Sequence, residues 1–386
     1  MNYRLTCLTP LLVGDGRRLS PIDYMVWKDQ VNVLDQRRIF RLLSKGPRLD
    51  GYLSQLKRAD KLDFASWGGF AQNFADRRVP FENAAFAAYW QRAMGESLHI
   101  PTFATNASGA YLPGTALKGV LRTGLMFSLA REGMLADVAA RMQADRPPRN
   151  PGLGVEEQAV GNSGASRMRP IAISDSGIID RAQFKIYLLR VSTLESRAPG
   201  TYSLAWKQSP RGSVDARRVE ESTPWFAEMA TPGTVVEGEW RENAFFAQPE
   251  IWKALRWGGP VDRARVFRGA NAYAAQLLAV HKQYAAWSGL QALGQNLAGL
   301  ESRLEQVNTG PPGQACIVSL GWGSGLLAKT PWVRRDDEAY RQVLRHIPIY
   351  ERAIKAGLPF PKTRRIVFMG NQPATLPGWA LLEVVE

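Results

Sequence analysis

The sequence is poor in the residues that build metal sites and covalent cross-links, with two cysteines and three histidines among 386 residues. Cys7 and Cys316 stand near opposite ends of the chain, which excludes a disulfide framework and a CxxC metal site. The histidines are isolated, with neither an HxxxH nor an HExxH pattern, and no carboxylates have metal-ligand spacing. We therefore expect no metal and no other cofactor.

Long apolar runs are missing as well. The longest stretch without a charge, 306–328, contains two prolines and five glycines and is unsuited to a membrane-spanning helix. The first ten residues include Arg4 and lack the apolar core of a signal peptide. No basic amphipathic helix with an aromatic face is found, so a membrane-surface protein is disfavoured. These features predict a cytoplasmic protein without a membrane partner.

Positive charge is what the sequence has in excess. Lysine and arginine number 49 against 35 aspartates and glutamates, which gives a formal net charge of +14. Hydrophobic residues make up 45% and charged residues 22%, as in ordinary folded domains. A folded chain this basic usually meets a polyanion, and nucleic acid is the first candidate.

The pattern of expected elements is of the α+β class. Apolar, β-prone segments form hairpins between a few long helices, and strands and helices do not alternate regularly. We expect one part at 1–245, with a helical insertion at about 47–110 and mobile loops at about 145–170 and 195–222. A C-terminal helical region with a glycine-rich loop should occupy 246–386.

The strongest local signal is PGTALKGVLR at 113–122. A Pro-Gly turn precedes Thr115, a natural N-cap, and a helix should run from there to about residue 142. A capping box calls for Glu or Gln at position 118, but the sequence has Lys118, with Arg122 four residues later on the same face. A cation in the first turn opposes the helix dipole unless an anion sits at the helix N-terminus. A solvated basic turn is the alternative; the predicted phosphate contacts are Gly114, Thr115, Lys118 and Arg122.

Two glycine-rich turns carry related signals. GDGRR at 14–18 joins a diglycine turn to two arginines, which suits backbone phosphates, although basic turns are common. GWGSG at 321–325 would let backbone N–H groups approach a phosphate, and its tryptophan could stack on a base or fill the core. Neither turn is a Walker A loop or a dinucleotide fingerprint. The predicted contacts are Gly14, Gly16, Arg17, Arg18, Gly321, Trp322, Gly323, Gly325 and Lys329.

Catalytic arrangements are scarce. The sequence shows no pattern of a Ser-His-Asp catalytic triad, and Asp23 is the only candidate for an RNA-cleaving carboxylate. Its alternative role is to cap the turn between a loop and a strand.

The order of these motifs resembles the RAMP superfamily of type III CRISPR systems. LTP at 8–10 with GDG at 14–16, and LSPIDY at 19–24, are similar to the family's N-terminus. The segment 111–122 resembles its IPGSSLKGALR element, and ISDS at 173–176 its SD strand end. The segment 321–330 resembles its C-terminal glycine loop. The SPIDY form and EMATPGT at 228–234 are similar to one branch, the fifth Csm subunits of type III-A effector complexes.

The resemblance implies a ferredoxin-like, RRM-type core with helical insertions, and it leaves open a second, degenerate RRM-like region in the C-terminal part. It implies a non-catalytic subunit that caps the 3′ end of the crRNA and supports crRNA maturation and antiviral defence. Its partners would be the crRNA, other Csm subunits, above all the backbone RAMP subunit, and indirectly the target RNA. An endoribonuclease that processes or trims crRNA stays the alternative. In related backbone subunits an aspartate near the first hairpin cleaves target RNA, and Asp23 is the nearest position here.

Overall fold

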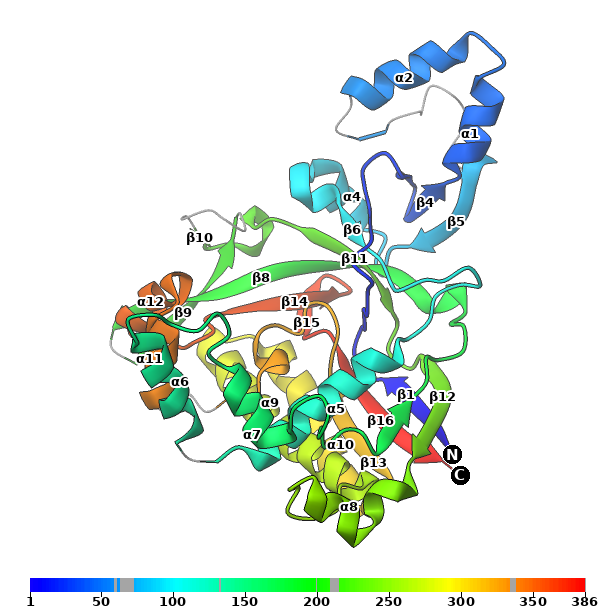
Figure 1. The fold of residues 1–386 in the computed structure, drawn as a ribbon. Coiled ribbons are helices and arrows are strands. Elements are labelled where there is room, and N and C mark those ends of the chain that lie inside the picture. The colour runs from blue at the N-terminus through cyan, green and yellow to red at the C-terminus, as the bar shows by residue number, and fades with distance from the viewer. Residues whose placement is uncertain are drawn as a thin grey trace.

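The computed structural model describes residues 1–58, 61–62, 73–131, 133–198, 200–208, 215–333 and 338–385 (Figure 1). Its main sheet is antiparallel, and its strands are ordered β13-β16-β1-β12-β7. Four of these strands, β16-β1-β12-β7, have the 4-1-3-2 order of a ferredoxin-like fold, with α5 and α9 as its two helices. The predicted α+β, RRM-like class is confirmed. These elements are β1 (Asn2–Cys7), α5 (Gly114–Leu129), β7 (Ile171–Ile173), β12 (Val235–Glu242), α9 (Arg263–Ser288), β13 (Ala315–Ser319) and β16 (Trp379–Val385).

A second antiparallel sheet is built around one long strand, β8. Its order is β10-β9-β8-β14-β15, and β11 pairs with the first half of β8. Arg364 and Arg365 on β14 lie beside Ser192 and Val191 of β8. The strands are β8 (Phe184–Ala198), β9 (Thr201–Lys207), β10 (Asp215–Ala216), β11 (Trp225–Ala230), β14 (Thr363–Met369) and β15 (Gln372–Thr375).

A projection extends from this body (Figure 1, blue). Three strands in the order β3-β4-β5 carry the helices α1 and α2, and a small apolar cluster of their own that includes Met25, Ile39 and Tyr52 fills the space between them. A half-buried ion pair between Arg77 of β5 and Glu228 of β11 ties the projection to the second sheet. Its elements are β3 (Tyr24–Trp27), β4 (Gln30–Leu34), α1 (Gln36–Leu43), α2 (Arg48–Arg58) and β5 (Ala75–Pro80).

The remaining elements cover the two sheets. The short strands β2 (Arg18–Leu19) and β6 (Ile100–Pro101) pair with each other. No helix in the described ranges is long and apolar enough to cross a membrane. The covering helices are α4 (Phe86–Arg92), α6 (Met134–Gln143), α7 (Leu153–Val160), α8 (Pro249–Ala254), α10 (Gln291–Thr309), α11 (Glu338–Arg345) and α12 (Pro348–Lys355).

Both predicted parts share one core. A continuous apolar cluster runs from Tyr3 to Val384, and strands from beyond residue 245 lie in both sheets beside strands from before it. The first and last strands are direct neighbours, with Asn2 opposite Val385 and Cys7 opposite Ala380. The boundary expected at 245 therefore does not separate two cores.

Several segments differ from the sequence-based expectation. The helix predicted to reach residue 142 is two helices, because the chain leaves helical geometry after Leu129 and Gly133 adopts a positive φ of 87°. The segment expected to be a helical insertion contains β5, paired with β4, and part of it lies outside the described residues. The loop expected at 145–170 contains α7, and the described part of 195–222 is mostly the β8-β9 hairpin.

Helix α5 begins in close contact with the end of β7. A side chain at Gly114 would lie against the carbonyl oxygens of Ile173 and Ser174, whereas one at Gly119 would meet open space. We expect Gly114→Ala to lower the free energy of unfolding by about 2 kcal/mol through overpacking.

The matched control, Gly119→Ala in the same helix, should raise the free energy of unfolding by about 0.5 kcal/mol, because alanine is the better helix former. Urea denaturation of both variants measures the difference. Equal effects of the two substitutions would contradict the close approach of α5 to β7.

Candidate nucleic-acid interface

Three of the segments singled out in the sequence meet at one surface groove with a volume of about 600 Å³. One wall is the 14–18 turn, another is the N-terminal half of α5, and the third is the glycine-rich loop that follows β13. The contributing side chains and glycines are Gly14, Gly16, Arg17, Arg18, Ala116, Gly119, Val120, Thr123, Gly321, Trp322, Ser324 and Lys329.

The glycine loop is fixed to the N-terminal segment by backbone contacts. The N–H of Trp322 donates to the carbonyl oxygen of Leu12 over 2.7 Å. Gly321 has a φ of +86°, and a Cβ at this position would lie against the same carbonyl. Only glycine suits this place, so Gly321 keeps the loop close enough to form the groove wall.

The groove is cationic. Arg17, Arg18 and Lys329 line it, and no acidic side chain is among its lining residues in the described part of the chain. Arg17 is 3.4 Å from Asp15, and Arg18 is 3.2 Å from Glu96, but both arginines are more than half exposed. Exposed ion pairs of this kind contribute about 0–1 kcal/mol, so both guanidinium groups can exchange their partners for a phosphate.

The start of α5 differs from the sequence-based expectation. Pro113 occupies the N-cap position, so the prediction of Thr115 as the N-cap was wrong; Thr115 is the second helical residue and is exposed. The N–H of Gly114 donates to Asp175 Oδ1 over 2.8 Å. The anion expected at the helix N-terminus is thus present as the carboxylate of Asp175, which follows β7.

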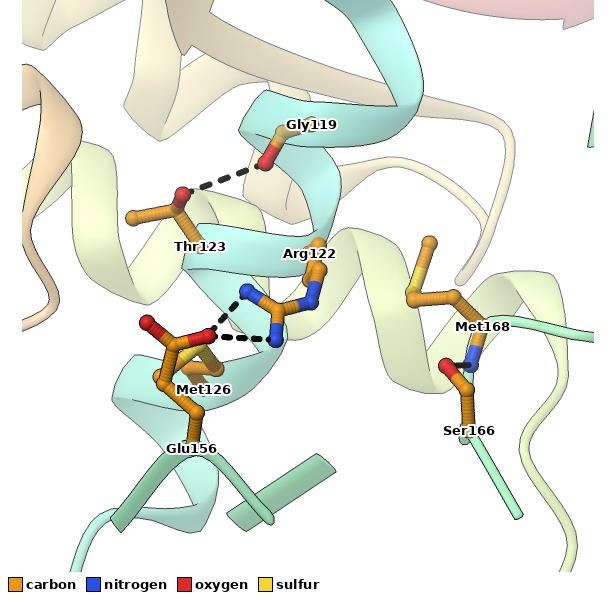
Figure 2. A network of polar contacts seen from close by, with 7 residues as sticks. All are labelled: Gly119, Arg122, Thr123, Met126, Glu156, Ser166 and Met168. Atoms are coloured by element: carbon orange, nitrogen blue, oxygen red, sulfur yellow. Dashed lines mark hydrogen bonds and ion pairs between the residues drawn. The ribbon is translucent and has the colours of Figure 1, made fainter. Parts of the chain in front are cut away.

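Lys118 and Arg122 share one face of α5, but this face does not line the groove. Lys118 directly precedes Gly119, and Arg122 directly precedes Thr123, which both line the groove. Successive residues of a helix are about 100° apart around its axis, so the two cations point away from the groove. Arg122 is ion-paired with Glu156 of α7 at 2.8 Å (Figure 2). Partial burial lowers the pKa of Lys118, and its ammonium forms no ion pair with the residues that the structure describes.

The other glycine-loop residues have mixed surroundings. Trp322 is half-buried, and the guanidinium of Arg365 lies 4.8 Å from the centre of its ring. Gly323 is buried near Pro377, and Gly325 is exposed with open space around it. Of the loop's predicted contacts, these two glycines do not line the groove.

Asp23 holds a turn of the chain. Its Oδ2 accepts hydrogen bonds from Ser20 N at 2.7 Å and from Ser20 Oγ at 2.6 Å, directly before β3. The interpretation as a turn-capping residue is confirmed by these contacts. Asp23 is not a lining residue of the groove, and within the described ranges no group of three His, Cys, Asp or Glu side chains could hold a metal ion.

Sequence reasoning missed the partners of the predicted residues. Thr102, which follows β6, and Ser319, at the end of β13, also line the groove. Glu156 was not foreseen as the partner of Arg122. No local pattern marks these positions, because each comes from an element distant in sequence.

Comparison with known proteins identifies the family. The sequence model of the RAMP superfamily matches residues 4–267. The chain belongs to the RAMP superfamily. No curated protein sequence matches it.

Two solved structures have a similar fold. One is a chain of a cryo-EM structure of a Csm–crRNA–target RNA ternary complex in a type III-A CRISPR–Cas system. Its TM-score to this chain is 0.68 and its sequence identity is 18%, and the match covers 99% of this chain and 100% of the other. Another is the crystal structure of T. onnurineus Csm5, with a TM-score of 0.60 and 16% sequence identity. This match covers 98% of this chain and 99% of the Csm5 chain. At these identities the likeness establishes the fold.

The cap of α5 yields a stability prediction. Asp175→Ala should lower the free energy of unfolding by about 1 kcal/mol, because the first N–H of the helix loses its acceptor. Thr115→Ala is the control and should change stability by less than about 0.5 kcal/mol, since Thr115 does not cap the helix. Thermal or urea unfolding compares the two; a larger loss for Thr115→Ala would restore the sequence-based assignment.

Proposed function

We propose that this RAMP protein is the crRNA-binding subunit that caps the 3′ end of the guide in a type III-A CRISPR effector complex, and that it binds RNA without cleaving it. The observation that carries the proposal is the groove in which two arginines, a lysine and two glycine turns meet. The similarity to Csm5 and to a chain of a Csm–crRNA–target RNA complex supports it.

The groove suits a sugar-phosphate backbone. Arg17, Arg18 and Lys329 supply charge, and the glycine turns let backbone N–H groups come close to phosphate oxygens. Contacts of this kind do not depend on base identity. A guide with a variable spacer requires such binding, because base pairing, not the protein, reads its sequence.

RNA that leaves the groove across α5 would reach Lys118 and Arg122. Gly119 forms the exposed ridge between the groove and these cations, and it has no side chain to obstruct the strand. Arg122 would exchange Glu156 for a phosphate at modest cost, because that ion pair is partly exposed to solvent. The exposed Thr115 hydroxyl and the exposed backbone of Gly325 complete the proposed contact set. Gly114 and Gly323, which the sequence also suggested, are buried, and the Gly114 N–H already donates to Asp175.

The proposed partners are the crRNA, the other Csm subunits and especially the backbone RAMP subunit, in the cytoplasm, with target RNA engaged through the guide. The subunit would support crRNA maturation and antiviral defence by protecting one end of the guide. No observation favours the alternative of an endoribonuclease, since Asp23 is engaged by Ser20 and does not line the groove.

Salt dependence tests the phosphate contacts. Affinity for single-stranded RNA should fall by about 0.7 log units per log unit of salt for each contact, so Lys329→Ala and Arg17→Ala should each weaken binding and reduce this slope by about 0.7. Lys118→Ala and Arg122→Ala should also lower the crRNA content of the purified complex.

Arg303→Ala on α10 removes the same charge from an exposed position outside the groove and serves as control. It should leave both the slope and the crRNA content unchanged. An equal loss in the control and in the groove variants would mean that net charge alone, and not this groove, binds the RNA.

The variant Asp23→Ala distinguishes RNA binding without cleavage from an endoribonuclease. We expect Asp23→Ala to leave target-RNA cleavage by the assembled complex unchanged, while the free energy of unfolding of the subunit falls by about 1 kcal/mol as two hydrogen bonds are lost. Cleavage is measured on a long complementary RNA. Loss of one specific cut on the guide's 3′ side, with an intact complex, would instead favour the nuclease.

A further inference from the structure

A second and larger cavity, about 1270 Å³ in volume, lies beyond the groove along α5. Its walls come from the C-terminal end of α5, from α9, from the β9 hairpin and from the satellite helices α6, α11 and α12. Small-molecule sites usually measure about 300–1,000 Å³, so this cavity has room for more than one small ligand.

Six aromatic rings are among the residues that line the cavity. Trp287 and Trp332 are half-buried, so part of each ring faces the open space. Tyr202 packs edge-on against Trp287 with ring centres 5.0 Å apart, and its hydroxyl donates to Gly357 O over 3.2 Å. The six rings are Phe127, Tyr202, Trp287, Trp332, Tyr340 and Phe360.

The polar residues of the cavity are cationic and amide side chains, beside the hydroxyl groups of Ser128 and Tyr202. Arg131 and Arg345 are exposed at its edge, and Gln276 and Gln283 project from α9. In the described part of the chain its lining includes no carboxylate. Rings for stacking, guanidinium groups for phosphates and amides for base edges are the combination that binds unpaired nucleotides.

The cavity continues the groove along two segments. Thr123 lines the groove and Phe127, one helical turn further along α5, lines the cavity, about 6 Å away along the axis. Lys329 lines the groove, and Pro331 and Trp332 line the cavity. The groove and the cavity therefore lie next to each other on α5 and on the chain segment after Lys329.

We propose that this cavity binds unpaired nucleotides of the same RNA strand, with bases stacked on Trp332 and Trp287 and a phosphate at Arg131. The inference rests on the proposed function and adds a base-binding element to a phosphate-binding groove. Stacking on indole rings tolerates any base, so the element stays compatible with a variable guide.

The experiment uses the full chain and two fluorescein-labelled RNAs with the same short oligouridylate. One carries a uridine extension, and the other carries an extension of abasic ribose-phosphate units. Fluorescence anisotropy should show the wild type binding the uridine extension about tenfold more tightly, since bases add stacking that abasic units lack. Trp332→Leu should abolish this preference and leave affinity for the short RNA unchanged.

Trp252→Leu on α8 replaces a half-buried tryptophan outside the cavity and should keep the preference. If circular dichroism shows that Trp332→Leu does not fold, the variant Arg131→Glu tests the proposal instead. Arg131 is exposed, and its reversal should weaken binding of both extended RNAs without affecting the short one.

Equal binding of uridine and abasic extensions by the wild type would overturn this inference. So would a uridine preference that survives in Trp332→Leu, or an unchanged affinity of Arg131→Glu for the extended RNAs. The proposed function stands in either case if Lys329→Ala weakens the short RNA. A short RNA that is indifferent to Lys329→Ala would overturn the proposed function, and the inference with it. A cavity filled by a protein segment instead would appear as unchanged RNA binding in both cavity variants.

Discussion

The pairing of the first strand with the last is the contact on which the groove depends. β1 and β16 pair from Asn2–Val385 to Cys7–Ala380, and Leu8 and Thr9 both donate their N–H groups to Trp379 O. Thr9 Oγ1 in turn accepts from Trp379 N over 3.0 Å. This ladder directs the N-terminal segment past the end of β13, so that two turns about 300 positions apart in sequence become the facing walls of one groove.

Much of the local structure follows from the sequence. The strands at both ends of the chain, the strand before the glycine loop and the helix after the Pro-Gly turn are formed by short patterns of apolar residues, and such patterns are local. The basic residues Arg17, Arg18 and Lys329 were also evident. Their meeting in space was not, because strand pairing is set by contacts between distant segments, and a single sequence does not encode register legibly.

The errors have the same origin. Thr115 was assigned as a cap because it stands beside a helix start, whereas the actual acceptor, Asp175, comes from a loop about 60 positions later. Arg122 stays a proposed phosphate contact, but its ion pair with Glu156 of another helix was not foreseen. In both places a side chain from a distant element makes the polar contact that the local sequence suggested for a neighbouring residue or for a ligand. The break at Gly133 was missed because apolar residues recur at helical spacing on both sides of it, at Leu125 and Leu129 and again at Met134 and Val138.

The ion pair between Arg77 and Glu228 gives the projection a defined direction. Two apolar surfaces can slide over each other at little cost, but a guanidinium and a carboxylate that meet through two parallel hydrogen bonds have one favourable orientation. Glu228 is almost fully buried, so a rotation that separated the pair would leave an uncompensated charge in the body. The ion pair therefore helps to fix the angle between projection and body, together with the backbone bridge between Phe81 and Ile186.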